Sequence, residues 1–237
     1  YGWDFDWCFQ THASARLDLS TLQLAKETGC FSFSYGLESA SPTVLKSMNK
    51  NIKPEQVIEA MKLAKQAKVG FSANIIFGDP AETTDTMAES LSFWLTNARE
   101  PFIFLSSVSP YPGSALFEAC RAKGMYQDKL AYYENIDKAP VNLTAIPSRE
   151  YDGLMQLTKF MEQSWLFVKT APVMKVEQLP EEDKYLKNVG GFYYRITAKC
   201  PHCGEEIHYK ERLVDPKAGW WLGTGCVNCN TRIKVVS

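Results

Sequence analysis

The 237-residue sequence lacks any apolar run close to the roughly 18 to 20 residues needed to cross a bilayer. It also lacks a positively charged opening segment followed by an apolar stretch, so we expect no secretory signal. Net charge is nearly absent too, because 26 Lys and Arg stand against 27 Asp and Glu. Without a basic field the chain has little to attract nucleic acid or anionic lipid. We therefore expect a cytoplasmic protein whose partner is a small molecule or another protein.

The cysteines are unevenly placed. The seven cysteines are an odd number, and four of them form two C-x-x-C pairs near the end of the chain. This arrangement is typical of metal ligation rather than of a disulfide framework, and it favours a reducing compartment. The first residue is Tyr1 rather than Met, and the residues that follow it are rich in aromatic side chains. We expect a further segment to precede the chain.

Short apolar runs alternate with helical patterns over the first half of the sequence. Strands are predicted near residues 9–13, 31–36, 71–77 and 102–108, and each of the later ones ends in a loop marked by Gly or Pro. Ser20 is expected to cap the first helix. This alternation is the pattern of βα units around a parallel sheet, so the predicted fold class is α/β.

The composition divides the chain into three parts. We assign residues 1–130 to the βα units and residues 131–188 to a helical extension and linker. Residues 151–168 carry the clearest helical pattern of the extension, and residues 172–188, with their run of charges, are the predicted linker. Residues 189–237 are richer in Gly, Tyr, Cys and Lys and are predicted to form a small β module.

That module carries the most specific signal in the sequence, a doubled C-x-x-C motif. Each tight turn brings two thiolates together, and two such turns complete a tetrahedral set of soft ligands that suits Zn²⁺. A rubredoxin-like iron centre and two redox dithiols are the alternatives. Four thiolates leave no open position, so we predict a structural zinc ribbon, and His202 and His208 are expected to be surface residues rather than ligands. The predicted ligands are Cys200, Cys203, Cys226 and Cys229.

Two polar side chains and one turn lie within or just after the predicted strands, whose carboxyl ends are where parallel α/β folds bind ligands. Glu38 could accept hydrogen bonds from a ligand, or it could serve only the N-terminus of the following helix. Asn74 lies in an apolar strand, and its buried amide needs a partner from the backbone or from a ligand. The Gly/Pro turn at residues 77–83 could present its backbone to a planar ring, although such loops are common.

Taken together, these segments resemble the radical SAM superfamily, especially the branch that often carries an N-terminal cobalamin-binding domain. A strand end of the form G-[IV]-E-S-[GA]-S, a V-L-x-x-M-N-[KR] helix, an F-G-x-P-x-E-T loop and a P-Y-P-G-[ST]-x-L loop follow one another in that order. An A-R-x-D segment precedes them. Several motifs in the right order are far more specific than any one of them. The matching stretches are residues 15–18, 36–41, 44–50, 77–83 and 110–116.

The resemblance implies a partial (β/α)₆ barrel, of which this chain would hold the C-terminal half, that binds S-adenosylmethionine beside a four-iron four-sulfur cluster. Reductive cleavage of the sulfonium would then produce a 5′-deoxyadenosyl radical that acts on a small-molecule substrate. By motif, Glu38 with its neighbour Ser39 would contact the ribose or methionyl amine, Lys50 the methionyl carboxylate, and Asn74 the ribose or methionine. The backbone of Phe77, Gly78 and Pro80 would contact adenine.

The sequence departs from this family in one important way. The C-x-x-x-C-x-x-C motif that holds the cluster is absent, and Cys8, Cys30 and Cys120 are too far apart to replace it. We therefore expect the cluster loop, the first barrel strands and any cobalamin domain to lie upstream, in the same or another polypeptide. Asp79 and Ala81 are milder departures, at positions where relatives commonly carry an apolar residue and Gly.

Two hypotheses follow from these observations. In the first, the chain is part of an enzyme and is inactive without the missing half of the barrel. In the second, it is a non-catalytic scaffold whose ribbon, with several Lys and Arg residues, recruits a protein or nucleic acid. The retention of Glu38, Lys50 and the Phe77 loop favours the first hypothesis.

Overall fold

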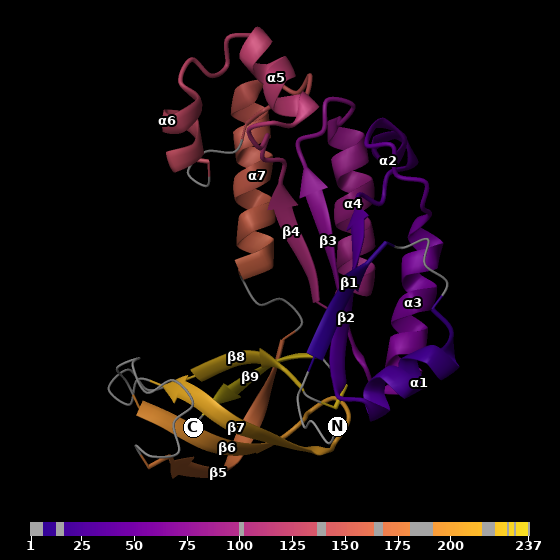
Figure 1. The fold of residues 1–237 in the computed structure, drawn as a ribbon, viewed down its shortest axis with the longest axis vertical. Helices are drawn as coiled ribbons and strands as arrows, with labels where there is room; N and C mark the ends of the chain where they lie inside the picture. The colour runs from indigo at the N-terminus through magenta and orange to yellow at the C-terminus, as the bar shows by residue number, and fades with distance from the viewer. Residues whose placement is uncertain are drawn as a thin grey trace.

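The structure is a computed structural model, and it describes residues 7–12, 17–99, 102–136, 141–163, 168–180, 192–214, 221–226, 228–229 and 231–236. Among these residues no helix combines the length and the apolar character needed to cross a membrane. Two sheets organise the chain, a parallel one built from the first half of the sequence and a second one built from the last third. Figure 1 shows the second sheet beneath the ends at which β3 and β4 begin.

The parallel sheet confirms the predicted α/β fold class. Its strands follow one another in sequence order, and each pairs in parallel with the next. Every connection therefore crosses over through helical segments, as parallel pairing requires. The strands are β1 (Trp7–Thr11), β2 (Cys30–Glu38), β3 (Gly70–Phe77) and β4 (Phe102–Ser107).

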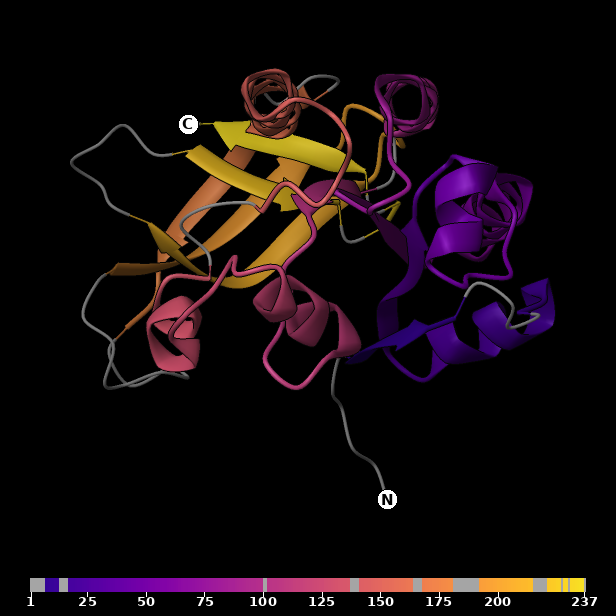
Figure 2. The same cartoon turned by 90° about the horizontal axis from the view of Figure 1, so that it is seen from above.

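The helices of this half cover one side of the sheet (Figure 2), and local signals fix where they start. The first helix is capped by Asp18, whose side chain accepts a hydrogen bond from the Thr21 amide at 2.8 Å, so the expectation of a Ser20 cap was wrong. Ser20 instead donates its hydroxyl to the same carboxylate at 2.9 Å. The helices are α1 (Leu19–Glu27), α2 (Pro42–Ser47), α3 (Pro54–Ala67) and α4 (Thr84–Asn97).

Three further helices follow β4. The first two, α5 (Ala115–Ala122) and α6 (Lys129–Glu134), lie beyond the end of the strands in Figure 1. The third, α7 (Ser148–Gln163), returns along the sheet and packs against β4. Its Tyr151 is fully buried in the same apolar core as the parallel strands, so α7 is an integral part of the first half of the molecule.

The second sheet has the strand order β7-β6-β5-β9-β8 and is mostly antiparallel. Its first strand in the sequence, β5, covers part of the segment at residues 172–188 that was expected to be a linker. Most side chains of β5 are exposed, so the strand lacks the apolar alternation by which a strand is recognised, and it contains Pro172, which is uncommon inside sheets. The strands are β5 (Lys169–Gln178), β6 (Phe192–Lys199), β7 (Glu206–Val214), β8 (Trp221–Gly225) and β9 (Arg232–Val236).

Two separate apolar cores hold these sheets. The first joins β2, β3 and the helices around a cluster of rings in which Phe33 lies 5.3 Å from Phe71 and 5.5 Å from Tyr35, centroid to centroid. The second is small, and it includes Cys200 and Cys226 among its buried members. The second sheet thus depends on residues that are also candidate metal ligands.

Candidate cofactor site and metal centre

Glu38, Lys50 and Asn74 meet at the carboxyl edge of the parallel sheet. The Lys50 Nζ donates to Glu38 Oε1 at 2.8 Å, and the Asn74 Nδ2 donates to Glu38 Oε2 at 2.6 Å. The Glu38 side chain is 14% exposed and that of Lys50 is 26% exposed, so both can be reached from solvent. Each carboxylate oxygen still has a free lone pair and the ammonium has further protons, which leaves the cluster able to bind a polar ligand.

The backbone at the end of β2 is shaped to hold this cluster. Glu38 has a φ of 63°, and the register with β3 shifts between Gly36 and Glu38, as in a β-bulge. A Cβ atom on Gly36 would collide with Glu38 Oε1 and would lie 3.3 Å from Lys50 Nζ. Glycine is therefore needed at this position for the carboxylate to turn back over the strand end.

Ser39 occupies a different environment from its neighbour. Its side chain is 1% exposed, and its Oγ lies 3.0 Å from the Oγ of Ser90 on α4. The Ala40 amide donates to Ser90 at 3.1 Å, and the Ser41 amide donates to Ser39 at 3.1 Å. Ser39 thus fastens the loop after β2 to α4, and the structure does not bring it together with Lys50 and Asn74.

The loop after β3 is held by a buried carboxylate that the sequence analysis did not single out. Phe77 is fully buried, Gly78 has a φ of 106°, and Pro80 is exposed. The Gly78 amide donates to Glu82 Oε2 at 2.5 Å, and Glu82 is 1% exposed. The signal for Glu82 was present in the sequence, because it is the Glu of the F-G-x-P-x-E-T motif.

The hydroxyl of Tyr151 on α7 lies close to Gly78 in this loop. A Cβ atom on Gly78 would lie 2.6 Å from the Tyr151 hydroxyl, so a larger residue cannot replace this glycine. The Glu82 Oε1 and the Tyr151 hydroxyl are both buried, and neither has a hydrogen-bond partner within the described chain. Burial, with the nearby Asp79 carboxylate adding to it, raises the pKa of Glu82 to about 7. Burial and the Glu82 charge raise the pKa of Tyr151 to about 12.

At the opposite end of the sheet, the four cysteines of the two C-x-x-C motifs form one cluster. The Sγ atoms of Cys200 and Cys229 lie 3.8 Å apart, as do those of Cys203 and Cys226. All four sulfur atoms lie within 4.8 Å of one another. A tetrahedral ion with metal–sulfur bonds of about 2.3 Å requires sulfur–sulfur distances of about 3.8 Å. The donor set and its spacing therefore fit a tetrahedral metal ion.

The turns that carry these cysteines support the same conclusion. The His202 amide points at Cys200 Sγ and the Asn228 amide at Cys226 Sγ, both at 3.4 Å. A hydrogen bond from Cys226 lowers the pKa of the Cys229 thiol to about 4, and the same interaction raises the pKa of Cys226. Backbone amides directed at sulfur stabilise thiolate, which is the form that binds metal.

The remaining cysteines and histidines do not add to this cluster. Among the described residues, the four-cysteine group is the one set of three or more potential ligands close enough to share a metal ion. Cys8 is exposed, whereas Cys30 and Cys120 are buried elsewhere. His208 is exposed, with its Nε2 3.4 Å from Glu206, as expected of a surface residue. His202 is half-buried beside the cluster. Of the A-R-x-D segment, residues 15 and 16 lie outside the described residues.

Comparison with known proteins bears on the first of these two sites, which lies within the matched residues. Residues 7–93 match the model of the radical SAM superfamily. Over 127 residues the chain is 32% identical to an uncharacterized methyltransferase of Pyrococcus horikoshii, a match that covers 52% of this chain and 27% of that protein. Over 108 residues it is 32% identical to the bacteriochlorophyllide d C-12(1)-methyltransferase of Chlorobaculum tepidum, covering 45% of this chain and 23% of that protein.

A solved structure shows a weaker likeness. The radical S-adenosylmethionine methyltransferase TsrM from Kitasatospora setae, with cobalamin and a [4Fe-4S] cluster bound, matches 48% of this chain and 21% of its own at 15% identity and a TM-score of 0.42. The chain spans about a quarter of the length of the curated relatives it matches. The resemblance to the radical SAM superfamily seen in the sequence motifs is confirmed over residues 7–93, where the chain matches the family model.

Proposed function

We propose that this chain is the C-terminal part of a radical SAM enzyme, in which the carboxyl edge of the parallel sheet binds S-adenosylmethionine. The observation that carries this proposal is the Glu38–Lys50–Asn74 cluster, which joins the end of β2, the loop after α2 and the middle of β3 in a segment that matches the family model. A carboxylate held between an ammonium and an amide is suited to accept the hydroxyls of a ribose. The spare protons of Lys50 are suited to a carboxylate.

The Gly78 loop would complete the site. The backbone there is fixed by Glu82 from within the loop and by Tyr151 from α7, so its peptide groups are positioned before a ligand arrives. Preorganised backbone groups of this kind lower the entropic cost of binding a planar base. In this proposal Phe77, Gly78 and Pro80 act through their backbones, since the Phe77 side chain is fully buried.

The four cysteines are proposed to hold a structural zinc ion. Four thiolates at tetrahedral spacing leave no open coordination position, which excludes a direct catalytic role for the metal. S-adenosylmethionine cleavage needs an electron delivered at close range. The iron–sulfur cluster that delivers it is proposed to come from outside this chain, because the sequence has no C-x-x-x-C-x-x-C motif. When bound, that cluster supplies the electron, whereas this chain supplies contacts to the nucleoside and the methionine.

Methyl transfer is the reaction class that the relatives favour, since both curated relatives described above are named as methyltransferases. The substrate is proposed to be a small molecule rather than nucleic acid, because the net charge is near zero.

The proposal is tested by equilibrium dialysis with labelled S-adenosylmethionine, using the chain alone and the chain completed with the amino-terminal half of a radical SAM barrel. The completed protein should bind the cofactor and form 5′-deoxyadenosine on reduction. The same measurements are repeated with cobalamin added.

Glu38→Gln should weaken binding by at least about tenfold, because a charge-assisted hydrogen bond contributes about 1.5 to 3 kcal/mol. The matched control is Glu59→Gln on the exposed side of α3, which should change nothing.

Two outcomes would overturn the proposal. If the completed protein holds a cluster but forms no 5′-deoxyadenosine, the scaffold hypothesis is favoured. If the 237-residue chain alone assembles a cluster and forms 5′-deoxyadenosine, the cluster ligands lie in this chain and the division of labour described above is wrong.

A further inference from the structure

The parallel sheet has two unequal faces. The helices α1, α3 and α4 cover one of them, and core side chains such as Phe33 on β2 and Ile75 on β3 point that way (Figure 2). Successive residues of a strand point to opposite faces, so the alternate residues lie on the opposite face, which we call the open face. Their side chains are half-buried or exposed. The central ones are Gln10, Ser34, Ser72, Asn74, Phe102 and Phe104, which the parallel register places side by side.

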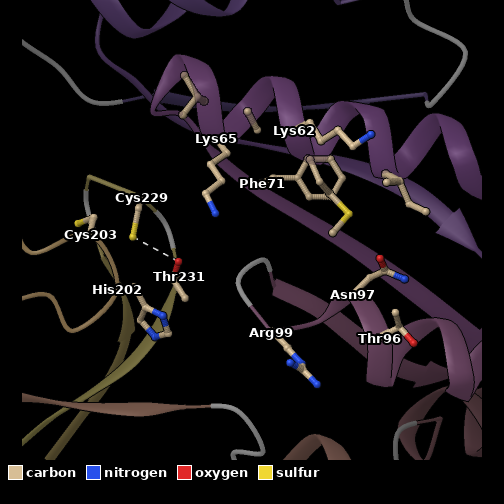
Figure 3. Close-up of a pocket in the computed structure, with 14 residues that line it drawn as sticks. Lys62, Lys65, Phe71, Thr96, Asn97, Arg99, His202, Cys203, Cys229 and Thr231 are labelled. Carbon is tan, nitrogen blue, oxygen red and sulfur yellow. Dashed lines mark hydrogen bonds between the residues drawn. The ribbon is translucent and has the colours of Figure 1, made fainter.

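A cavity of about 480 Å³ lies on the helix side of this sheet, between α3, the end of α4 and the cysteine turns (Figure 3). Phe71 lines it, and the Phe71 ring belongs to the core under the helices. Lys65 and Arg99 line it too, and both already have interaction partners. The cavity therefore belongs to the junction between the two halves, whereas the open face adjoins the Glu38 cluster.

Asn74 joins the open face to the proposed cofactor site. Its side chain lies on this face, and its Nδ2 donates to Glu38 Oε2 at 2.6 Å. Its second amide proton and its carbonyl oxygen remain for a ligand. The Glu38 carboxylate lies against Gly36, which is the next residue after Ser34 on the open face. A molecule on the open face would therefore lie next to a cofactor held by Glu38.

The strand side chains of the open face are uncharged over the residues that the structure describes. Ser34 and Ser72 are neighbours in the register and are both half-buried, and neither hydroxyl has a hydrogen-bond partner among the described residues. Each hydroxyl can therefore donate one hydrogen bond and accept others. A charged ligand would lose hydration here without gaining an opposite charge. The face thus favours a neutral molecule with hydrogen-bonding groups.

Phe104 supplies an aromatic surface beside these hydroxyls. Its side chain is 44% exposed, and it is the neighbour of Asn74 in the register. The ring of Phe102 lies 6.0 Å away and has the Arg232 guanidinium 4.8 Å from its centre, so Phe104 is the better placed of the two rings to stack on a ligand. From Phe104 to Ser72 the strand spacings give roughly 8 Å, which two fused rings can span.

We propose that the open face binds the molecule on which the enzyme acts, and that this molecule is an uncharged, planar heteroaromatic compound of two fused rings. Its ring stacks on Phe104, and its polar edge exchanges hydrogen bonds with Ser34 and Ser72. A second copy of the chain suits this face less well, because subunit interfaces are poor in serine and rich in apolar side chains. The inference rests on the proposed function only in naming the bound molecule as the substrate.

The test uses the 237-residue chain and quinolin-2(1H)-one, a neutral bicyclic lactam whose N–H donor adjoins its carbonyl acceptor, followed by ligand-observed NMR or calorimetry. The lactam should bind about two- to tenfold more tightly than its N-methyl derivative, which lacks the donor. The anion 2-naphthoate, of similar size, should bind more weakly than either.

Two variants locate the probe on the open face. Phe104→Leu keeps an apolar side chain but removes the ring, and it should weaken lactam binding by about two- to tenfold. Ser72→Ala should reduce the preference for the lactam over its N-methyl derivative. The matched controls are Phe31→Leu, at a 46% exposed ring of β2 that is not on the open face, and Ser92→Ala at an exposed serine of α4. Neither control should change binding.

A cofactor measurement separates this inference from the proposed function. In the completed protein, Phe104→Leu and Ser72→Ala should leave S-adenosylmethionine binding unchanged, because neither residue contacts Glu38 or Lys50. Loss of cofactor binding with lactam binding intact would count against the proposed function alone.

Four results would overturn the inference. Two are equal binding of the lactam and 2-naphthoate, and lactam binding that Phe104→Leu does not weaken. The third is loss of lactam binding when the amino-terminal half of the barrel is added. The fourth is a dimer, detected by analytical ultracentrifugation, that Phe104→Leu dissociates. In the last two cases protein, rather than a small molecule, covers the open face.

Discussion

The two sheets of this chain reach stability by different means. The parallel sheet buries a large apolar core that runs from Leu22 on α1 to Tyr151 on α7. Among the side chains whose burial the structure describes, the second sheet buries far fewer, and two of these, Cys200 and Cys226, are candidate metal ligands. A small module cannot bury enough apolar surface to offset its chain entropy, and in our proposal metal ligation takes the place of a larger core. The difference predicts that the two halves respond to different perturbations.

The largest effect is expected from Cys203→Ser. Loss of one thiolate should release the metal, which contributes on the order of 10 kcal/mol to folding of such modules. Residues 192–236 should then become protease-sensitive while the helices of the first half keep their far-ultraviolet circular dichroism. Cys8→Ser, at an exposed cysteine outside the cluster, is the control. A proteolysis pattern like that of the unaltered protein would argue against a structural metal. Elemental analysis that finds iron in place of zinc would show that the cysteine cluster holds a different metal.

The converse perturbation is Phe33→Ala in the first core. Phe33 is 1% exposed and packs against Phe9, Tyr35 and Phe71, so truncation leaves a cavity among these rings. The free energy of unfolding of the first half should fall by about 3 to 5 kcal/mol, with metal content unchanged. Urea denaturation and metal analysis on the same sample check this. If the metal is lost at the same urea concentration at which the first half unfolds, the two halves unfold as one unit.

A smaller effect, confined to the first half, should depend on pH. The native pKa of Glu82 is raised to about 7 from an ordinary value of 4.5, so the native state keeps a proton that the unfolded chain loses. The resulting stabilisation is complete below about pH 4.5, is lost as pH rises through 7, and amounts to at most about 3 kcal/mol.

Glu82→Gln should remove that pH dependence, because an amide cannot ionise but can still accept from the Gly78 amide. Asp79 and Tyr151 are the titratable groups that act on Glu82, and both remain in the variant. Urea midpoints measured between pH 5 and 8 for both proteins report the difference directly. If the urea midpoints of the two proteins change with pH in the same way, Glu82 does not titrate in this range.

The smallest effect is expected at the junction between the halves. The Arg232 guanidinium of β9 lies 4.8 Å from the centre of the Phe102 ring on β4. A double-mutant cycle with Arg232→Met and Phe102→Leu should give a coupling of about 1 kcal/mol, typical of a cation–π contact. Lys199→Met on β6, an exposed lysine, serves as the control. Zero coupling would mean that this contact does not contribute to holding the two halves together.

Much of this architecture was predictable because local signals agree with it. The strand at residues 70–77 and the helix at residues 54–67 have clear periodicities and begin or end at Gly or Pro. The clustering of the four cysteines was predictable from the spacing of the two C-x-x-C motifs alone. Long-range contacts were not: nothing local to Tyr151 shows that its hydroxyl will rest against Gly78. β5 was missed because its exposed residues lack apolar alternation, and the cavity beside the cysteines exists only once two distant segments meet.

The strand orders of the two sheets also set the order in which they can fold during synthesis. Each strand of the parallel sheet pairs with the one made just before it, so this half can grow one βα unit at a time as the chain emerges. In the second sheet, β5 pairs in parallel with β9, and β6, β7 and β8 are all made between them. β5 must therefore wait with one edge unpaired until β9 and the second cysteine turn have left the ribosome. During that interval the exposed edge is the part of the nascent chain most prone to aggregation.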